Sequence, residues 1–154
     1  MTTIARLVLA AALAAAPAAT AQVAGDVVGR WATPGLGAVV ELSHCADVST
    51  LCGTIRWLWD AVDEKGRPRL DAQNTDASLR GRPLVGLVIL SGLKARRGGG
   101  WEGQIYNPED GQTYRAIVGR RGGDTLVVEG CVLFVCREQV WRRTSALAEA
   151  LGRI

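Results

Sequence analysis

The side chains that could carry chemistry are concentrated in one polar segment. Asp71 and Asp76 flank Asn74, and Arg80 and Arg82 follow. Paired carboxylates can perform acid–base work, and converging Asp, Asn and Arg side chains can select a polar ligand. The same residues could instead hold the segment together, with Asn74 capping a helical turn, Asp76 at its positive end and an Asp–Arg pair fixing the loop. We favour this self-contained loop.

The rest of the chain offers little for nucleophilic catalysis or metal binding. Its one histidine, His44, lies next to Cys45, and no G-x-S-x-G segment places a serine nucleophile. Zinc held by His44, Cys45 and Cys52 is the alternative to a disulfide at that point, and we do not favour it. We therefore expect no metal and no cofactor, and we favour a binding protein over an enzyme. An enzyme would use Asp71, Asn74 and Arg82.

Residues 1–21 have the pattern of an export signal. Arg6 precedes an apolar run of ten residues, Leu7 to Ala16, which is shorter than the roughly 20 residues that span a bilayer. Ala19-Thr20-Ala21 fits an A-x-A cleavage site. We expect cleavage, with an uncleaved anchor as the alternative. The mature chain, residues 22–154, is then one periplasmic domain without stable membrane insertion.

The charge of the chain gives no argument for nucleic acid as a partner. The formal charge of +3 falls by one when Arg6 is removed. The basic cluster from Lys94 to Gly100 precedes a strand pattern, and a phosphate-binding loop needs a helix N-terminus. We expect a solvated hairpin loop there and no nucleic-acid partner. The sequence indicates no particular oligomeric state.

Export places the four cysteines in an oxidising compartment. Spacing favours local bridges, Cys45 with Cys52 and Cys131 with Cys136, each closing a short loop between strands. Loop entropy gives each bridge roughly 2 kcal/mol of stability.

Short alternating or apolar segments predict eight strands and almost no helix. On the third strand the alternation places Gly53, Ile55, Trp57 and Trp59 on one face. Antiparallel strands of this number form an up-and-down barrel, with a two-sheet sandwich as the alternative. We expect a short helical turn in the long loop between strands 3 and 4, and a C-terminal helix over residues 145–152. The predicted strands cover about 26–33, 37–43, 51–59, 84–93, 101–106, 112–119, 125–130 and 137–143.

Aromatic side chains could line a ligand cavity in such a barrel. The interior of an eight-stranded barrel is either filled by side chains or holds one small ligand. Tyr106 and Tyr114, on the two arms of one hairpin, could face each other across it. We expect a small, partly apolar ligand, and the alternative is an envelope protein-interaction module with a filled barrel. The candidate ligand-binding residues are Trp57, Asp71, Asn74, Arg82, Trp101, Tyr106 and Tyr114.

Four segments carry a family resemblance. They are L-C-G-T-I-R-W-L (51–58), D-A-Q-N-T-D-A-S-L-R-G-R-P-L-V-G-L (71–87), W-E-G-Q-I-Y-N-P-E-D-G-Q-T-Y (101–114) and G-C-V-L-F-V-C-R-E-Q-V-W-R-R (130–143). Together they resemble a family of exported bacterial proteins catalogued as domain of unknown function 2147. The family pattern usually has Asn-Pro-Asp where this chain has Asn74-Thr75-Asp76. The resemblance implies a lipocalin-like barrel and no established reaction.

A shorter motif agrees with this resemblance. Gly29-Arg30-Trp31 is similar to the G-x-W that opens lipocalin-type barrels, in which the tryptophan plugs the closed end. A basic residue near the last strand covers that tryptophan, and Arg143 or Arg142 would do so here. The resemblance therefore assigns Trp31 and Arg143 to barrel closure, with a cation–π contact of roughly 0.5–2 kcal/mol.

Overall fold

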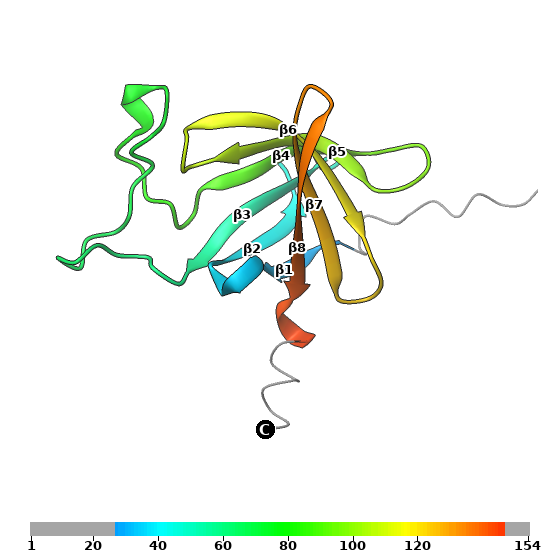
Figure 1. Ribbon diagram of the computed structural model, residues 1–154, viewed down its shortest axis with the longest axis horizontal. Coiled ribbons are helices and arrows are strands. Elements are labelled where there is room, and N and C mark those ends of the chain that lie inside the picture. The colour runs from blue at the N-terminus through cyan, green and yellow to red at the C-terminus, as the bar shows by residue number, and fades with distance from the viewer. Residues whose placement is uncertain (1–26, 147–154) are drawn as a thin grey trace, which may run out of the picture.

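The computed structural model describes residues 27–146 (Figure 1). The predicted signal peptide, residues 1–21, lies outside the described residues. So does most of the predicted C-terminal helix, because the description ends at Ala146. Within residues 27–146, no helix has the length and apolar character needed to cross a membrane.

Eight antiparallel strands form a closed barrel in which each strand pairs with the next and β8 pairs with β1. This confirms the predicted up-and-down barrel and excludes the two-sheet sandwich. The predicted helical turn between β3 and β4 is only a three-residue 3-10 helix, η3 (Ala77–Leu79), and a second one, η2 (Pro34–Leu36), follows β1. The strands are β1 (Gly29–Ala32), β2 (Ala38–His44), β3 (Leu51–Leu58), β4 (Val88–Ala95), β5 (Trp101–Asn107), β6 (Gln112–Arg120), β7 (Thr125–Val132) and β8 (Val135–Arg143).

The up-and-down order gives the barrel two different ends. The β1–β2, β3–β4, β5–β6 and β7–β8 connections lie at one end, here called the open end. The other three connections and the start of β1 lie at the opposite, closed end. Figure 1 shows the long β3–β4 connection and the β5–β6 turn side by side on the left. The open end therefore carries most of the irregular chain, where binding residues usually lie.

Buried tryptophans dominate the core. Trp31, Trp101 and Trp141 are each at most 2% exposed. They pack with the inward-facing aliphatic side chains of the strands, which include Val40, Leu42, Leu51, Ile55, Leu90, Leu93, Val118, Leu126 and Val128. Trp101, a predicted ligand contact, is thus a core residue.

The predicted barrel-closure residues meet at the closed end. The Trp31 indole nitrogen donates a hydrogen bond to the Val27 carbonyl at 2.8 Å. The Arg143 guanidinium carbon lies 4.2 Å from the centre of the Trp31 ring, and its Nη1 donates to the Val28 carbonyl at 3.3 Å. These contacts join the start of β1 to the end of β8, where the two strands share only two paired positions.

Both predicted disulfides are confirmed. Cys45 is bonded to Cys52 across the β2–β3 loop, and Cys131 to Cys136 across the β7–β8 turn. β7 and β8 continue beyond their cysteines to the paired Val132 and Val135. The β7–β8 turn is therefore a two-residue loop, tighter than the sequence indicates.

The face of Trp57 differs from the prediction because β3 contains a bulge. Val40 pairs with Ile55, but the preceding Val39 pairs with Trp57, so Arg56 is an extra residue. A bulge of this kind reverses the alternation of side chains beyond it. Ile55 is buried inside the barrel, whereas Trp57 points outward and is 40% exposed. The prediction that Trp57 lines the barrel is wrong.

Candidate functional site

The long segment between β3 and β4, residues 59–87, contains the predicted polar cluster. Isolated bridges pair Val62 with Pro68 and Leu70 with Pro83, so the segment doubles back on itself twice. The second of these folds brings Asp71 next to Arg82, whose carbonyl accepts the Asp71 amide at 2.9 Å. Backbone pairing within the segment thus places the acidic and basic residues together.

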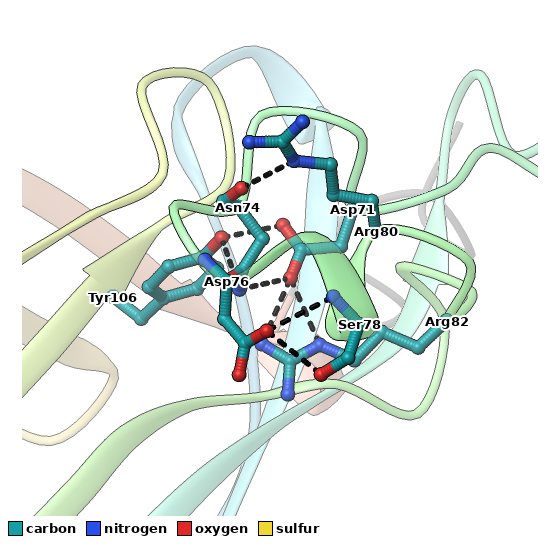
Figure 2. A network of polar contacts seen from close by, with 7 residues as sticks. All are labelled: Asp71, Asn74, Asp76, Ser78, Arg80, Arg82 and Tyr106. Atoms are coloured by element: carbon teal, nitrogen blue, oxygen red, sulfur yellow. Dashed lines mark hydrogen bonds and ion pairs between the residues drawn. The ribbon is translucent and has the colours of Figure 1, made fainter.

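The Asp71 carboxylate is the centre of a buried polar network (Figure 2). Asp71 is fully buried. Its Oδ1 accepts the Tyr106 hydroxyl proton at an oxygen–oxygen distance of 2.5 Å. Its Oδ2 accepts from Asn74 Nδ2 at 2.8 Å and from Arg82 Nε and Nη2, both at 2.8 Å. Four of the seven predicted ligand-binding residues therefore meet, but they satisfy one another.

Asn74 has a different role from the predicted helix cap. Its Oδ1 accepts the Asp76 amide at 2.9 Å, and its carbonyl accepts Arg80 Nε at 2.7 Å. Asp76 is the N-cap of η3, and its carboxylate accepts the Ser78 amide at 2.9 Å. The assignment of Asn74 as the cap is wrong because η3 starts at Ala77 and Asp76 is its N-cap. The Asn74 side-chain nitrogen instead donates to Asp71 and Tyr106. The turn begins two residues later.

The network attaches the long segment to the outer wall of the barrel. Tyr106 lies on the outward face of β5, and the Arg82 guanidinium lies 5.6 Å from the centre of its ring. Gly111, in the β5–β6 turn, has φ +70°, and a Cβ there would be 1.9 Å from the Gln73 carbonyl oxygen. Only glycine permits this close approach. The segment and the β5–β6 hairpin are thus packed as one unit.

The network keeps Asp71 ionised and Tyr106 neutral. Burial raises the pKa of Asp71, but hydrogen bonds from Tyr106, Asn74 and Arg82 outweigh it, and the net pKa lies below the ordinary value. Burial and the bond to the Asp71 carboxylate raise the pKa of Tyr106. The carboxylate is thus poorly basic and closed to solvent, which suits a structural role better than general-base catalysis.

An open pocket lies at the open end, beside this network. Its volume is about 580 Å³, within the usual range for small-molecule sites. Leu58 and Leu84 are half-buried, whereas Trp59 is 73% exposed. Arg69 forms an ion pair with Asp60. The lining residues are Gly35, Gly37, Leu58, Trp59, Asp60, Arg69, Leu84 and Glu109.

Sequence reasoning did not find this pocket. Its residues come from the β1–β2 loop, the end of β3, the long segment and the β5–β6 turn, which only the barrel brings together. None of the seven predicted ligand-binding residues lines it. The one available signal in the sequence was the apolar Trp59 followed by the charged Asp60, directly after the third strand. A second hollow of about 490 Å³ shares Arg69 and Leu84 with it.

The remaining predicted ligand contacts are dispersed. Tyr106 opposes Thr113 across the β5–β6 hairpin, and Tyr114 opposes Ile105. Adjacent residues of a strand point to opposite faces, so the two tyrosines do not face each other, and that prediction is wrong. The Tyr114 hydroxyl donates to Asp110 Oδ2 at 2.7 Å.

The described residues 27–146 offer no convincing set of metal ligands. His44 is exposed, and its Nδ1 donates to the Val48 carbonyl at 2.8 Å. Glu129, Cys131 and Cys136 have potential ligand atoms close together, but the two sulfur atoms are joined in a disulfide. A disulfide sulfur lacks the thiolate charge that binds metal ions.

A closed up-and-down barrel of eight strands, with a tryptophan and an arginine at its closed end, defines a lipocalin-like protein. A solved structure described as "Protein HP1028 from the human pathogen Helicobacter pylori belongs to the lipocalin family" superposes with a TM-score of 0.65. The two chains are 21% identical, and the match covers 76% of this chain and 82% of the other. At this identity the likeness shows the fold alone.

The family model described as "Uncharacterized protein conserved in bacteria (DUF2147)" matches residues 29–143. The chain belongs to this family, which confirms the resemblance carried by its four segments. No curated protein matches the chain.

Proposed function

We propose that the protein binds a small amphipathic molecule in the pocket at the open end of the barrel. The observation that carries this proposal is the composition of the pocket. Apolar surface from Leu58, Leu84 and Trp59 is combined there with the Asp60–Arg69 ion pair and the charge of Glu109. Small-molecule sites typically pair apolar walls with a few polar groups that fix orientation. An apolar ligand body would lie on the leucines, with its polar group at Arg69 or Glu109.

The dense packing of the barrel interior favours a ligand site at the mouth of the barrel over one deep inside it. Trp31, Trp101 and Trp141 are large side chains buried among the inward aliphatic residues. An eight-stranded barrel is just wide enough for side chains to fill it. The pocket, by contrast, is open and lies where several loops meet.

The polar network supports this binding role indirectly. Asp71 fixes the fold of the segment that carries Arg69 and Leu84. An enzymatic role for Asp71, Asn74 and Arg82 receives no support, because the fully buried Asp71 offers a substrate no free position. The network positions the pocket wall and leaves recognition to other residues.

We also propose that the protein acts in the periplasm after export. Two disulfides suit an oxidising compartment, and residues 1–21 have the pattern of a cleaved signal. N-terminal sequencing of protein from a periplasmic fraction should give a start near Gln22. A chain that retains Met1, or that stays in the cytoplasm, would contradict this part of the proposal.

Ligand binding can be tested through Trp59 fluorescence. The protein is titrated with fatty acids, acylated amino acids and aromatic amines, and tryptophan emission is recorded. We expect a saturable blue shift that Trp59→Phe reduces, and Arg69→Ala should weaken binding of anionic ligands at least about tenfold. Val48→Ala, an exposed apolar residue of the β2–β3 loop, is the matched control. Saturable binding that neither pocket variant affects would overturn the proposed site.

A further inference from the structure

The turn of the β7–β8 hairpin is apolar and exposed. Val132, Leu133, Phe134 and Val135 are 55%, 84%, 90% and 62% exposed. Successive residues point to opposite faces of the hairpin, so apolar side chains surround the turn on both sides. Figure 1 shows this turn projecting at the top, apart from the β5–β6 turn and the long segment on the left. We call residues 132–135 the apolar tip.

The backbone of the apolar tip is unusual for its sequence. Leu133, the first residue of the two-residue turn, has φ +54°. Glycine usually takes this position in such turns, because a side chain there is strained. The disulfide between Cys131 and Cys136 lies directly behind the tip and holds the two strands together. The chain thus presents a leucine where glycine would be easier to accommodate, on a covalently closed support.

Two exposed arginines occupy the register positions nearest the apolar tip, one on β8 and one on the neighbouring β6. Arg115 pairs with Cys131, and Arg137 pairs with Gly130, one position farther from the tip. The paired Glu129 and Glu138 follow at the next position, and a carboxylate oxygen of Glu129 lies within 4.8 Å of the Cys131 and Cys136 sulfurs. Arg115 also contacts Glu102, at 2.7 Å. We call the exposed Arg115 and Arg137 the basic collar, and acidic groups of Glu102 and Glu129 lie among them.

We propose that the apolar tip inserts into the interface of a phospholipid membrane, with Leu133 and Phe134 below the headgroups and the basic collar at the phosphates. Four apolar residues are far fewer than the roughly 20–30 residues per partner of a stable protein interface. A lipid interface needs no complementary groove and surrounds an inserted tip on every side. The basic collar matches the phosphate charge. Such insertion is shallow and reversible, and it spans nothing.

The test is flotation of the purified, exported protein with vesicles. Vesicles of phosphatidylethanolamine and phosphatidylglycerol (3:1) are compared with phosphatidylcholine vesicles. We expect Phe134→Ser and Leu133→Gly each to lower partitioning at least about tenfold. Leu133→Gly should unfold at an equal or higher temperature, because glycine relieves the strain. A loss of binding by this variant is therefore not a loss of folding.

Two further variants separate the parts of the proposal. Arg137→Gln should lower partitioning onto the anionic vesicles about fivefold and leave the phosphatidylcholine value unchanged. Val48→Ser removes an apolar side chain that is 75% exposed in the β2–β3 loop, and it should change nothing. Absence of vesicle binding, or binding that Phe134→Ser does not reduce, overturns the proposal. So does a dimer in solution that Phe134→Ser dissociates, because the tip would then contact a second copy.

Discussion

Asp71 is the residue on which the conformation of the long segment depends most. One buried carboxylate accepts hydrogen bonds from three side chains, which belong to the segment and to β5. We expect Asp71→Ala to lower the free energy of unfolding by about 2–4 kcal/mol, because it leaves the amide of Asn74 and the hydroxyl of Tyr106 without their acceptor. Urea denaturation followed by circular dichroism measures the loss.

A matched variant, Asp76→Ala, helps to distinguish a structural role of Asp71 from a functional one. Asp76→Ala removes an exposed cap carboxylate of the same segment and should destabilise the protein much less. If Asp71→Ala unfolds like the wild type yet loses a measured activity, the network is a functional site and the structural interpretation fails.

The network also predicts how stability depends on pH. The pKa of Asp71 is lowered on folding, so its contribution is complete above about pH 5 and is lost as the pH falls through the lowered value. The pKa of Tyr106 is raised, so its contribution is complete below about pH 9 and is lost as the pH rises above 10. The difference in unfolding free energy between wild type and Asp71→Asn should narrow below pH 4. A difference that stays constant from pH 7 to pH 3 would contradict this pKa direction.

At the scale of single residues, the sequence indicated which polar side chains lie together, but it did not indicate the structural role of each one. The run from Asp71 to Arg82 predicted that these side chains converge. It could not show that Tyr106, 35 positions beyond Asp71, closes the network. It also misplaced the helix cap, because η3 starts at Ala77 and is capped by Asp76.

β3 shows where element-level prediction from sequence stops. Its alternation holds from Leu51 to Ile55, and the bulge at Arg56 then moves Trp57 to the outer face. A bulge depends on pairing with β2, which alternation in one strand does not report. The open-end pocket escaped prediction for a similar reason, because distant loops form it.

The disulfides act at the level of single loops. We expect the double variant Cys45→Ser/Cys52→Ser to lower the unfolding free energy by about 2 kcal/mol, because it frees a short loop in the unfolded chain. Thermal unfolding with and without reductant measures this loss. Because the double variant has no disulfide in the β2–β3 loop, reductant should lower its unfolding temperature less than it lowers that of the wild type. A loss well above 5 kcal/mol would mean that the bridge supports far more than its own loop.

For the whole molecule, the sequence predicted the barrel architecture well. That architecture depends on the number of strands and on short connections between them, and both can be recognised in the sequence. Eight patterned segments and an opening Gly29-Arg30-Trp31 were sufficient to indicate a closed barrel. Closure itself is uneven. The β7–β8 ladder has eight paired positions, whereas β1 and β8 share two. A closed barrel has no free edge, but its shortest ladder is the place where an edge can form.

We therefore predict that the barrel opens first between β1 and β8. In native-state hydrogen exchange, peptides covering residues 27–33 should exchange at least about tenfold faster than those covering β6, because local opening follows the least-supported backbone. Arg143→Ala should accelerate exchange in β1 about fivefold to thirtyfold, because it removes the cation–π contact with Trp31. Arg121→Ala removes a surface ion pair with Glu138 and should leave β1 unchanged. Equal acceleration of every strand by Arg143→Ala would instead show that the barrel opens only as a whole. The closed-end tryptophan would then support the entire fold, and the β1–β8 ladder would have no independent opening.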